Sequence, residues 1–338
     1  MKQINIAMFG FGGIARSHYA AYTALMEKGV PIRIVAVCDA NAAQFQTQIA
    51  INNAAFEVAL GDDVHLYTQA DDLIANEAFD AADICLPTHL HKEITLKLLR
   101  AGKHVLCEKP MALCSADCEE MAKTAKQVGK QLLIGHCLRF SPAYRYLKEL
   151  IDRQTYGKLL DLHLHRASMS PSWSAGNWLQ DRQKSGGCIL DTHIHDIDIA
   201  NYFFGMPQAV SSLECDAPPY WQTVSTRLFY PHLTVTADGS WHDMPNTKFT
   251  AGCKARFERA NVIMELYDLT VYPDGGTPFT PSISTASPID EEVACFVERL
   301  LSGQYHNEHT PNDFCNSVKI IERMRESARS NGEKLLIL

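Results

Sequence analysis

The stretch that decides the fold is Ile4-Asn5-Ile6-Ala7-Met8-Phe9-Gly10-Phe11-Gly12-Gly13-Ile14-Ala15. A short apolar run leads into a glycine-rich turn, and residues 15–28 then have helical spacing and stop at Gly29. A second apolar, β-branched run follows at 32–38. This order predicts a strand–helix–strand unit that binds a dinucleotide. A turn that needs glycine for packing alone is the alternative.

Each small residue of this turn has an expected task. Gly10 permits the tight turn, Gly12 lets the backbone approach a pyrophosphate, and Ala15 allows the helix to pack closely on the strand. The helix N-terminus presents free N–H groups to an anion. The predicted cofactor-binding residues here are therefore Gly10, Gly12, Gly13 and Ile14.

Asp39 ends the second predicted strand. A carboxylate at that position can accept hydrogen bonds from a ribose diol and would repel a 2′-phosphate, so we expect NAD to be preferred over NADP. The interval from Gly10 is somewhat longer than is usual for this motif. A helix N-cap or turn aspartate is the alternative interpretation.

Strand and helix continue to alternate to about residue 135, which predicts a doubly wound parallel sheet of the Rossmann type. In this part we expect strands at 65–67, 82–86, 104–107 and 131–134, and helices at 42–60, 71–77, 93–100 and 115–128. Beyond it, apolar residues recur with period two around 160–164, 224–228, 233–237 and 249–257, which predicts an antiparallel sheet with one covered face. Two closing helices are expected near 290–302 and 312–330. The predicted fold is thus α/β, with a Rossmann domain at 1–135 and an α+β domain at 136–338.

Composition excludes several classes of function. The chain of 338 residues has 31 Lys and Arg against 39 Asp and Glu, a net charge of −8, and no basic stripe, so we expect no nucleic-acid partner. No apolar run is long enough for a membrane span, and the N-terminal run is interpreted as a strand rather than a signal sequence. The 11 dispersed cysteines fit buried, reduced thiols and a cytoplasmic protein.

Lys109 lies in the segment Cys107-Glu108-Lys109-Pro110, directly after an apolar run. Oxidation of an alcohol by a nicotinamide needs a base for the hydroxyl proton and benefits from a cation beside the developing alkoxide. Lys109 can supply the cation and, with a lowered pKa, can share in proton transfer. Pro110 biases Lys109 away from helix. A surface lysine in a loop is the alternative.

Asp191 and His195 provide the second set of candidate catalytic groups. Residues 188–204 are predicted to form one helix closed by Gly205, on which these two side chains share a face with Asp198, while His193 and Asp196 point elsewhere. His195 can act as acid and base near neutral pH, and Asp191 can orient it or bind a substrate hydroxyl. A buried, hydrogen-bonded histidine is the alternative. His193 and His195 do not converge on a helix, so we expect no metal.

Together these segments resemble the Gfo/Idh/MocA-type oxidoreductases, the group of glucose–fructose oxidoreductase and inositol dehydrogenase. The resemblance runs in order through about the first 205 residues, and its motifs are Gly10–Ala15, Pro87-Thr88-His89-Leu90-His91, Gly102-Lys103-His104-Val105-Leu106-Cys107-Glu108-Lys109-Pro110, Arg139-Phe140-Ser141-Pro142, and Gly186-Gly187-Cys188-Ile189-Leu190-Asp191 through His195 and Asp198.

The resemblance implies a Rossmann domain followed by an α+β domain whose large open sheet serves homodimer or homotetramer contacts. It implies Lys109, Asp191 and His195 as the catalytic set, with hydride passing between a sugar, polyol or inositol carbon and NAD. Further implied positions are Pro87, Thr88 and His91 along the cofactor cleft, Glu108 at the nicotinamide end, and Arg139 and Trp178 in the substrate pocket, where Trp178 can equally be a packing residue. His193 departs from the family, which often has glycine there.

Two rival functions stay open. An NAD-dependent glycosidase would oxidise its sugar transiently, eliminate the aglycone and reduce the product again, with no net NADH. A non-catalytic NAD-binding regulator would bind the cofactor without turnover. Retention of Lys109, Asp191 and His195 together argues against the regulator.

Overall fold

The computed structural model describes residues 3–46, 49–51, 54–56, 58–217, 221–244, 246–304 and 309–337. The chain divides into two compact units. The first comprises Met1–Ala112, Ala116–Cys137 and Ile289–Cys315, and the second comprises Leu113–Ser115, Leu138–Pro288 and Asn316–Leu338. The expected division assigned all of 136–338 to the second domain, whereas here the segment Ile289–Cys315 packs as part of the first.

The first unit contains the predicted parallel sheet. Its six strands are ordered β5-β2-β1-β6-β7-β8, and every neighbouring pair is parallel. The strands are β1 (Ile4–Phe9), β2 (Ile32–Cys38), β5 (His65–Tyr67), β6 (Ala81–Ile84), β7 (His104–Glu108) and β8 (Leu132–Gly135). β1 has β2 as its neighbour on one side and β6 on the other. From β1 the chain first builds the sheet outward through β2 and β5, and then builds it in the opposite direction from β6, so the strand order reverses between β1 and β6. Ligands of doubly wound sheets bind at that position, outside the carboxyl ends of the strands.

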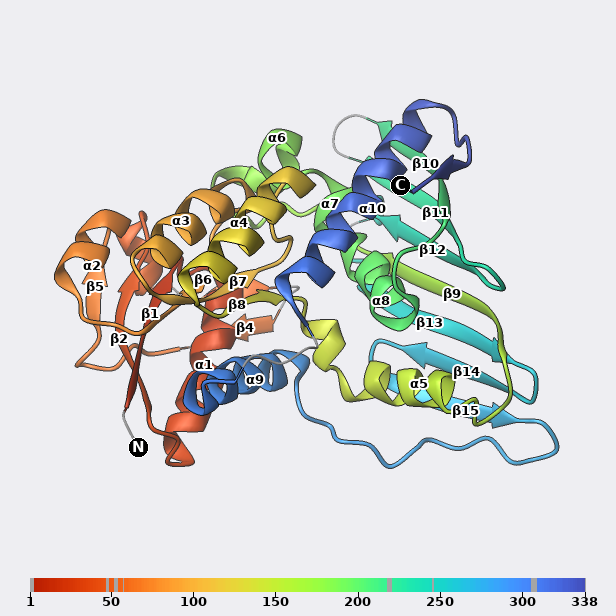
Figure 1. Cartoon of the computed structure of the whole chain (residues 1–338), viewed down its shortest axis with the longest axis horizontal. Coiled ribbons are helices and arrows are strands. Elements are labelled where there is room, and N and C mark those ends of the chain that lie inside the picture. Colours follow the sequence, from red (N-terminus) through yellow and green to blue (C-terminus); the bar gives the residue numbers. More distant parts are fainter. Residues whose placement is uncertain are drawn as a thin grey trace. The chain divides into compact units, whose positions relative to one another are not determined.

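Helices cover both faces of this sheet (Figure 1). In Figure 1, α3 and α4 lie over one face, and α1 and α9 lie over the other. The helices of the unit are α1 (Gly13–Glu27), α2 (Ala70–Asn76), α3 (Thr88–Arg100), α4 (Ser115–Val128) and α9 (Pro288–Ser302). Their positions agree with the expected strand–helix alternation, apart from one segment.

The helix predicted at 42–60 was wrong. That segment begins with a short 3₁₀ helix, Ala42–Phe45, and continues as a two-stranded antiparallel ribbon of β3 (Ile49–Ile51) and β4 (Ala54–Phe56). Phe45, Ile49 and Phe56 have helical spacing, but Ile49 and Ile51 also alternate as in a strand. β-Branched residues favour that second pattern, and short apolar runs fit both.

The second unit is built on a mixed eight-stranded sheet in the order β15-β14-β13-β9-β12-β11-β10-β16. Among the described strands of this sheet, only β9 and β12 pair in parallel, so the sheet is mainly antiparallel, as expected. Its strands are β9 (Leu159–Ala167), β10 (Ala209–Ala217), β11 (Trp221–Phe229), β12 (Thr234–Ser240), β13 (Thr250–Phe257), β14 (Ala260–Glu265), β15 (Asp268–Pro273) and β16 (Leu335–Leu336).

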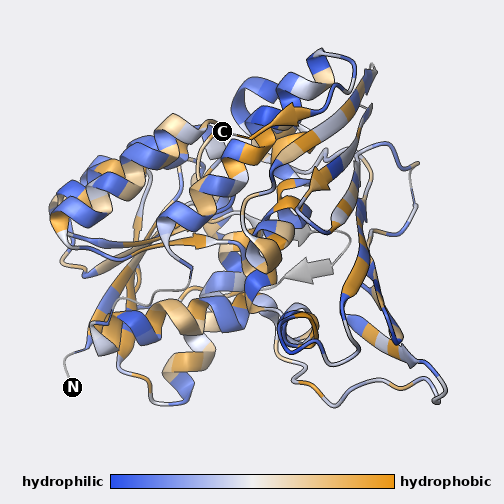
Figure 2. Ribbon diagram, turned by 45° about the vertical axis from the view of Figure 1, so that its right-hand side comes forward, coloured by the Kyte–Doolittle hydropathy of each residue, from blue (hydrophilic) through white to orange (hydrophobic). Residues whose placement is uncertain are grey.

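One face of this sheet is covered by α5 (Pro142–Asp152), α7 (Cys188–Asp191), α8 (Ile194–Phe204) and α10 (Pro311–Arg329). Leu162, Leu164, Val235 and Ala237 are fully buried on that face, whereas His163, Thr236 and Asp238 on the other face are not. Figure 2 shows the resulting alternation of hydrophobic and hydrophilic residues along the strands. Period-two patterning therefore reports a half-covered sheet.

All 11 cysteines are free thiols, and most are buried. Among the described residues, no helix combines the length and the apolar character that crossing a membrane requires.

Candidate functional site

The glycine-rich turn lies between β1 and α1. Gly10 has φ +89°, and a Cβ there would collide with the carbonyl of Cys85, so only glycine fits. Gly12 caps α1, and a Cβ built on it would have no atom within 4 Å. The first turn of α1 carries no acidic side chain. Open space and unobstructed amides at a helix N-terminus are what a pyrophosphate requires, so these residues fit a dinucleotide.

Asp39 lies directly beyond β2 and is half-buried. Its Oδ2 accepts a hydrogen bond from the Phe11 amide at 2.8 Å, and its Oδ1 accepts one from the Asn41 amide at 2.8 Å. Each carboxylate oxygen retains capacity for a further donor. The side chain thus links the glycine-rich turn to the end of β2.

Lys109 follows the last residue of β7 and is partly exposed, and its peptide bond to Pro110 is cis. Glu108 is 8% exposed, and its Oε2 accepts a hydrogen bond from the Lys109 amide at 3.0 Å. Gly135 on β8 leaves room for Glu108, since a Cβ there would lie 2.8 Å from Glu108 Oε1. The sheet therefore fixes the backbone that carries Lys109.

His91 lies in α3, which begins at Thr88 with Pro87 as its N-cap residue. The His91 ring lies between two backbone carbonyls, with Nδ1 2.8 Å from Pro110 O and Nε2 2.7 Å from Leu86 O. Burial lowers the pKa of His91. Both Thr88 and His91 are almost fully buried, so His91 connects the end of β6 to the turn after Lys109.

A buried polar cluster beneath Glu108 was missed by the sequence analysis. His18 on α1 lies with Nδ1 2.9 Å from Asp83 Oδ2 and with Nε2 3.3 Å from Glu108 Oε1. Glu292 on α9 is fully buried, and its nearest titratable neighbours include Glu108 and His18. Asp83 in an otherwise apolar strand and Glu292 on an apolar helix face were the available signals, because charged residues are seldom buried without partners.

Asp191 and His195 lie on two helices rather than one, so the helix predicted over 188–204 was wrong. α7 ends at Asp191 and α8 starts at Ile194. The amide of His193 bonds to Cys188 O at 2.9 Å, and the amide of Asp196 bonds to His193 O at 3.1 Å. These i→i−5 and i→i−3 bonds replace the regular i→i−4 pattern, so spacing of four residues does not by itself put Asp191 and His195 on one face.

Asp191 and His195 differ from the residues around them in solvent exposure. Between residues 185 and 201, every residue is buried except Asp191 and His195, which are both partly exposed. Burial of a carboxylate or an imidazole is costly, and partial exposure to water lowers that cost for Asp191 and His195. Both side chains are therefore reachable from outside their unit's core.

Asp198, expected to share a face with His195, pairs with Arg139. Arg139 Nε donates to Asp198 Oδ2 and Nη2 donates to Asp198 Oδ1, each at 2.7 Å, and Ser317 Oγ donates to Oδ1 at 2.7 Å. Arg139 and Asp198 are 2% and 1% exposed. This buried bidentate pair holds α8, and Arg139 was predicted from the resemblance to line the substrate pocket.

His193 packs behind the helices. Its Nε2 lies 3.2 Å from Thr226 Oγ1 on β11, and burial lowers its pKa to about 3. Gly239 on β12 makes this possible, because a Cβ there would lie 2.8 Å from His193 Nδ1. Trp178, by contrast, is half-exposed on a short 3₁₀ segment, Ala175–Gln180.

Two family models match the chain. Residues 4–136 match a model described as an oxidoreductase family with an NAD-binding Rossmann fold, and residues 144–253 match the GFO/IDH/MocA C-terminal domain. Together they cover the first sheet and strands β9 to β12 of the second.

Similar proteins have related names. The chain is 32% identical to 2,7-anhydro-N-acetylneuraminate hydratase of Mediterraneibacter gnavus over 62% of this chain and 52% of that protein. It is 34% identical to myo-inositol 2-dehydrogenase of Thermotoga maritima over 41% of this chain and 40% of that protein. The matched regions thus span about half the length of these relatives or less. A crystal structure of myo-inositol 2-dehydrogenase from Lactobacillus plantarum superposes with a TM-score of 0.80 and 25% identity, covering 100% of both chains.

Proposed function

Since the chain belongs to the Gfo/Idh/MocA family of oxidoreductases, we propose that it is an NAD(P)-dependent dehydrogenase of a sugar, polyol or inositol-type secondary alcohol. The observation that carries this proposal is the partial exposure of Asp191 and His195 within a stretch that is otherwise buried. Polar groups exposed alone in such a stretch are candidates for contact with a ligand.

Each residue has a role in the proposed reaction. His195 accepts the hydroxyl proton and returns it in the reverse direction, and Asp191 orients His195 or binds a substrate hydroxyl. Lys109 places a cation beside the developing alkoxide and shares in proton transfer. Nicotinamide, when bound, accepts the hydride. Lys109 belongs to the first unit, and Asp191 and His195 belong to the second.

The cofactor proposed is NAD rather than NADP. Gly10, Gly12, Gly13 and Ile14 form the turn and the first helical residues at the carboxyl end of β1, which suit a pyrophosphate. Asp39 carries a carboxylate where the ribose diol would lie, and a 2′-phosphate would meet that negative charge. Pro87, Thr88 and His91, with Glu108, complete the proposed cofactor contacts.

Arg139 and Trp178 have different proposed roles at the substrate. Arg139 is held by Asp198, so we assign it to positioning α8, and through α8 His195. Trp178 is half-exposed and is proposed to contact the substrate directly. The open face of the second sheet is proposed as the surface of a homodimer or homotetramer, which light scattering of the purified protein tests.

The deciding experiment is absorbance at the NADH band with NAD and a panel of free sugars, polyols, inositols and sugar acids. Growth of the band with one stereochemical subset is expected. No signal across the panel, with NAD binding established by thermal shift, would contradict a dehydrogenase.

A second candidate function is supported by two relatives that share one name. The name 2,7-anhydro-N-acetylneuraminate hydratase denotes addition of water rather than net oxidation. The same residues can oxidise a sugar transiently and reduce it again, as in an NAD-dependent glycosidase, so that NAD acts catalytically. Release of aglycone from aryl glycosides without net NADH would favour this candidate over the dehydrogenase.

A further inference from the structure

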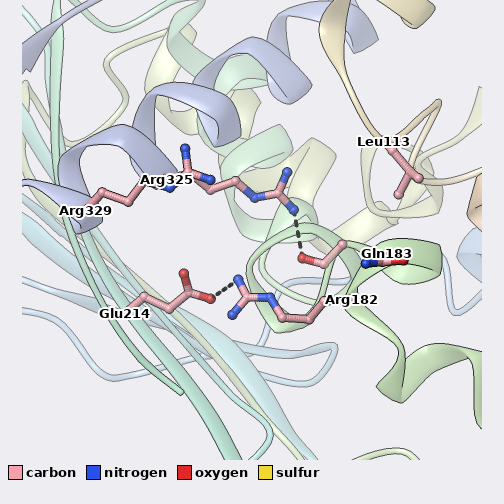
Figure 3. A pocket seen from close by; sticks show the side chains of 7 residues that line it. Leu113, Arg182, Gln183, Glu214, Arg325 and Arg329 are labelled. Carbon is pink, nitrogen blue, oxygen red and sulfur yellow. Dashed lines mark hydrogen bonds and ion pairs between the residues drawn. The ribbon is translucent and has the colours of Figure 1, made fainter. Parts of the chain in front are cut away.

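A cavity of about 520 Å³ in the second unit is lined by three arginines (Figure 3). Arg182 begins α6 (Arg182–Ser185), and Arg325 and Arg329 lie one turn apart near the end of α10. Gln183, Gly186 and Glu214 of β10 also line the cavity. No residue of this wall takes part in the proposed proton or hydride transfer.

The three arginines of this wall differ in their direct partners. Arg182 is neutralised, because its Nη1 donates to Asp216 Oδ2 and its Nη2 donates to Glu214 Oε1, both at 2.6 Å. Arg325 is half-buried and donates from Nη2 to the Gly186 carbonyl at 2.7 Å, and no carboxylate of the described residues forms an ion pair with it. Arg329 is exposed, and the described part of the chain records no carboxylate against it. Within the described residues, two guanidinium groups thus lack a direct ion pair.

Burial and several charges act on Arg325. Burial lowers its pKa, Arg182 and Arg329 act in the same direction, and Glu214 and Glu322 act in the opposite direction. A buried cation is costly unless it is paired. An anion placed between Arg325 and Arg329 would remove that cost.

We propose that this cavity binds the anionic group, a carboxylate or a phosphate, of a monosaccharide, with Arg325 and Arg329 as its ligands. The planar guanidinium fork matches both groups and binds them bidentately. A volume of about 520 Å³ is within the range of small-molecule sites and accommodates the sugar as well as its acid.

The wall of the cavity continues into the segment that carries Asp191. Gly186 can hold Arg325 because it lacks a side chain, since a Cβ there would lie 2.8 Å from Arg325 Nη2. The next residue, Gly187, accepts a hydrogen bond from the Asp191 amide at 2.8 Å. The inference therefore rests on the proposed function and deepens it: the alcohol oxidised belongs to an acidic sugar.

Calorimetric titration of the full chain, saturated with NAD, tests the cavity with four probes. Galacturonate and glucose 6-phosphate carry the two anionic groups, and galactose and glucose are their neutral counterparts. We expect one anionic probe to bind at least about tenfold more tightly than its neutral counterpart. Which probe does so distinguishes a carboxylate from a phosphate.

Arg329→Gln is the main variant, because it removes a charge without removing an intramolecular contact that the structure records. It is expected to weaken binding of the preferred anionic probe at least about tenfold and to leave binding of the neutral sugars unchanged. Arg323→Gln is the matched control on the same helix, since Arg323 bonds to Leu336 O and pairs with Glu326. Equal binding of anionic and neutral sugars, or unchanged binding by Arg329→Gln, would overturn the proposal.

The two proposals fail separately. If neutral sugars are oxidised with full dependence on Lys109 while acidic sugars do not bind, the dehydrogenase stands and the anion site falls. If an acidic sugar binds in an Arg329-dependent manner without NADH formation, the site stands and the dehydrogenase activity falls.

Discussion

The carboxylate of Asp39 accepts a hydrogen bond of 2.8 Å from the backbone amide of Phe11. The residue proposed to recognise the ribose therefore also fixes the glycine-rich turn proposed to hold the pyrophosphate. The Asp39 side chain thus connects the two parts of the proposed cofactor site by a hydrogen bond, and a change at Asp39 is expected to affect both parts.

Replacing Asp39 with alanine is expected to lower the preference for NAD over NADP by about tenfold or more, because the negative charge that repels a 2′-phosphate is gone. The ratio of kcat/KM values for the two cofactors measures this. Asp39→Asn keeps an acceptor for the backbone amides and serves as control for turn geometry. An unchanged ratio in Asp39→Ala would show that Asp39 does not face the ribose.

Lys109→Ala and His195→Ala are each expected to lower kcat by about 100-fold or more, as loss of a proton-transfer group does. NAD binding, measured by calorimetry, should stay close to that of the unmodified protein. Lys126→Ala and His232→Ala, both at exposed positions, are the matched controls. Near-normal turnover in both active-site variants would contradict the assigned roles.

Gly239→Ala is expected to destabilise the protein by about 1–3 kcal/mol, as overpacking of a core does. The added Cβ would lie 2.8 Å from His193 Nδ1 and 3.0 Å from Val224 Cγ1. His193→Ala in the same background should restore most of the loss, because it removes the larger partner. Urea unfolding of the two single variants and the double variant measures the coupling, and strictly additive effects would refute the contact.

Glu292 should make stability fall as pH rises. Burial and the charge of Glu108 hold its pKa well above the ordinary 4.5, so between these two values the folded protein binds a proton that the unfolded chain has lost. The free energy of unfolding then decreases by about 1.4 kcal/mol per pH unit for that one proton.

His18 adds a term of the same sign. Its pKa is raised well above 6.5: burial itself lowers it, and the contacts with Asp83 and Cys85 outweigh that effect. The contribution of His18 to the free energy of unfolding is complete below pH 6.5 and is lost as the pH rises through the raised pKa. Glu108, whose pKa is lowered by His18 against the effect of burial, contributes above 4.5 and loses that contribution in acid.

Glu292→Gln keeps the shape of the neutral acid and cannot ionise. It is expected to flatten the dependence of unfolding free energy on pH between 5 and 8, and to be more stable than the parent at the upper end. Urea unfolding across that range is the measurement, with Glu298→Gln at an exposed position of the same helix as control. Parallel profiles for Glu292→Gln and the parent would disprove a raised pKa.

Local signals in the sequence were enough for the nucleotide-binding half of the fold. Gly10, Gly12 and Asp39 act through backbone conformation and strand ends, which short segments encode, and the alternation of strands and helices follows from periodicity. The period-two runs after residue 135 predicted the second sheet for the same reason. The prediction of a helix at 42–60 failed because the spacing of its apolar residues fits both a helix and a strand.

Tertiary contacts explain two features of the site that the spacing of residues along the chain did not predict. At the break between Asp191 and Ile194, His193 packs against Gly239, 46 residues away in sequence. Asp198 is held by Arg139, which a helical wheel drawn on α8 alone cannot reveal.

The sequence by itself therefore determined the two sheets, the glycine-rich turn and the identity of the candidate catalytic groups. Only the tertiary structure decided which charged groups are paired and which are left over: Asp198 is neutralised, Glu292 is buried against Glu108, and Arg325 and Arg329 face a cavity. The physical reason is that hydrophobic periodicity and turn preferences are short-range properties of the chain. The energy of a charge, in contrast, depends on partners and on exclusion of water, which only the folded chain supplies.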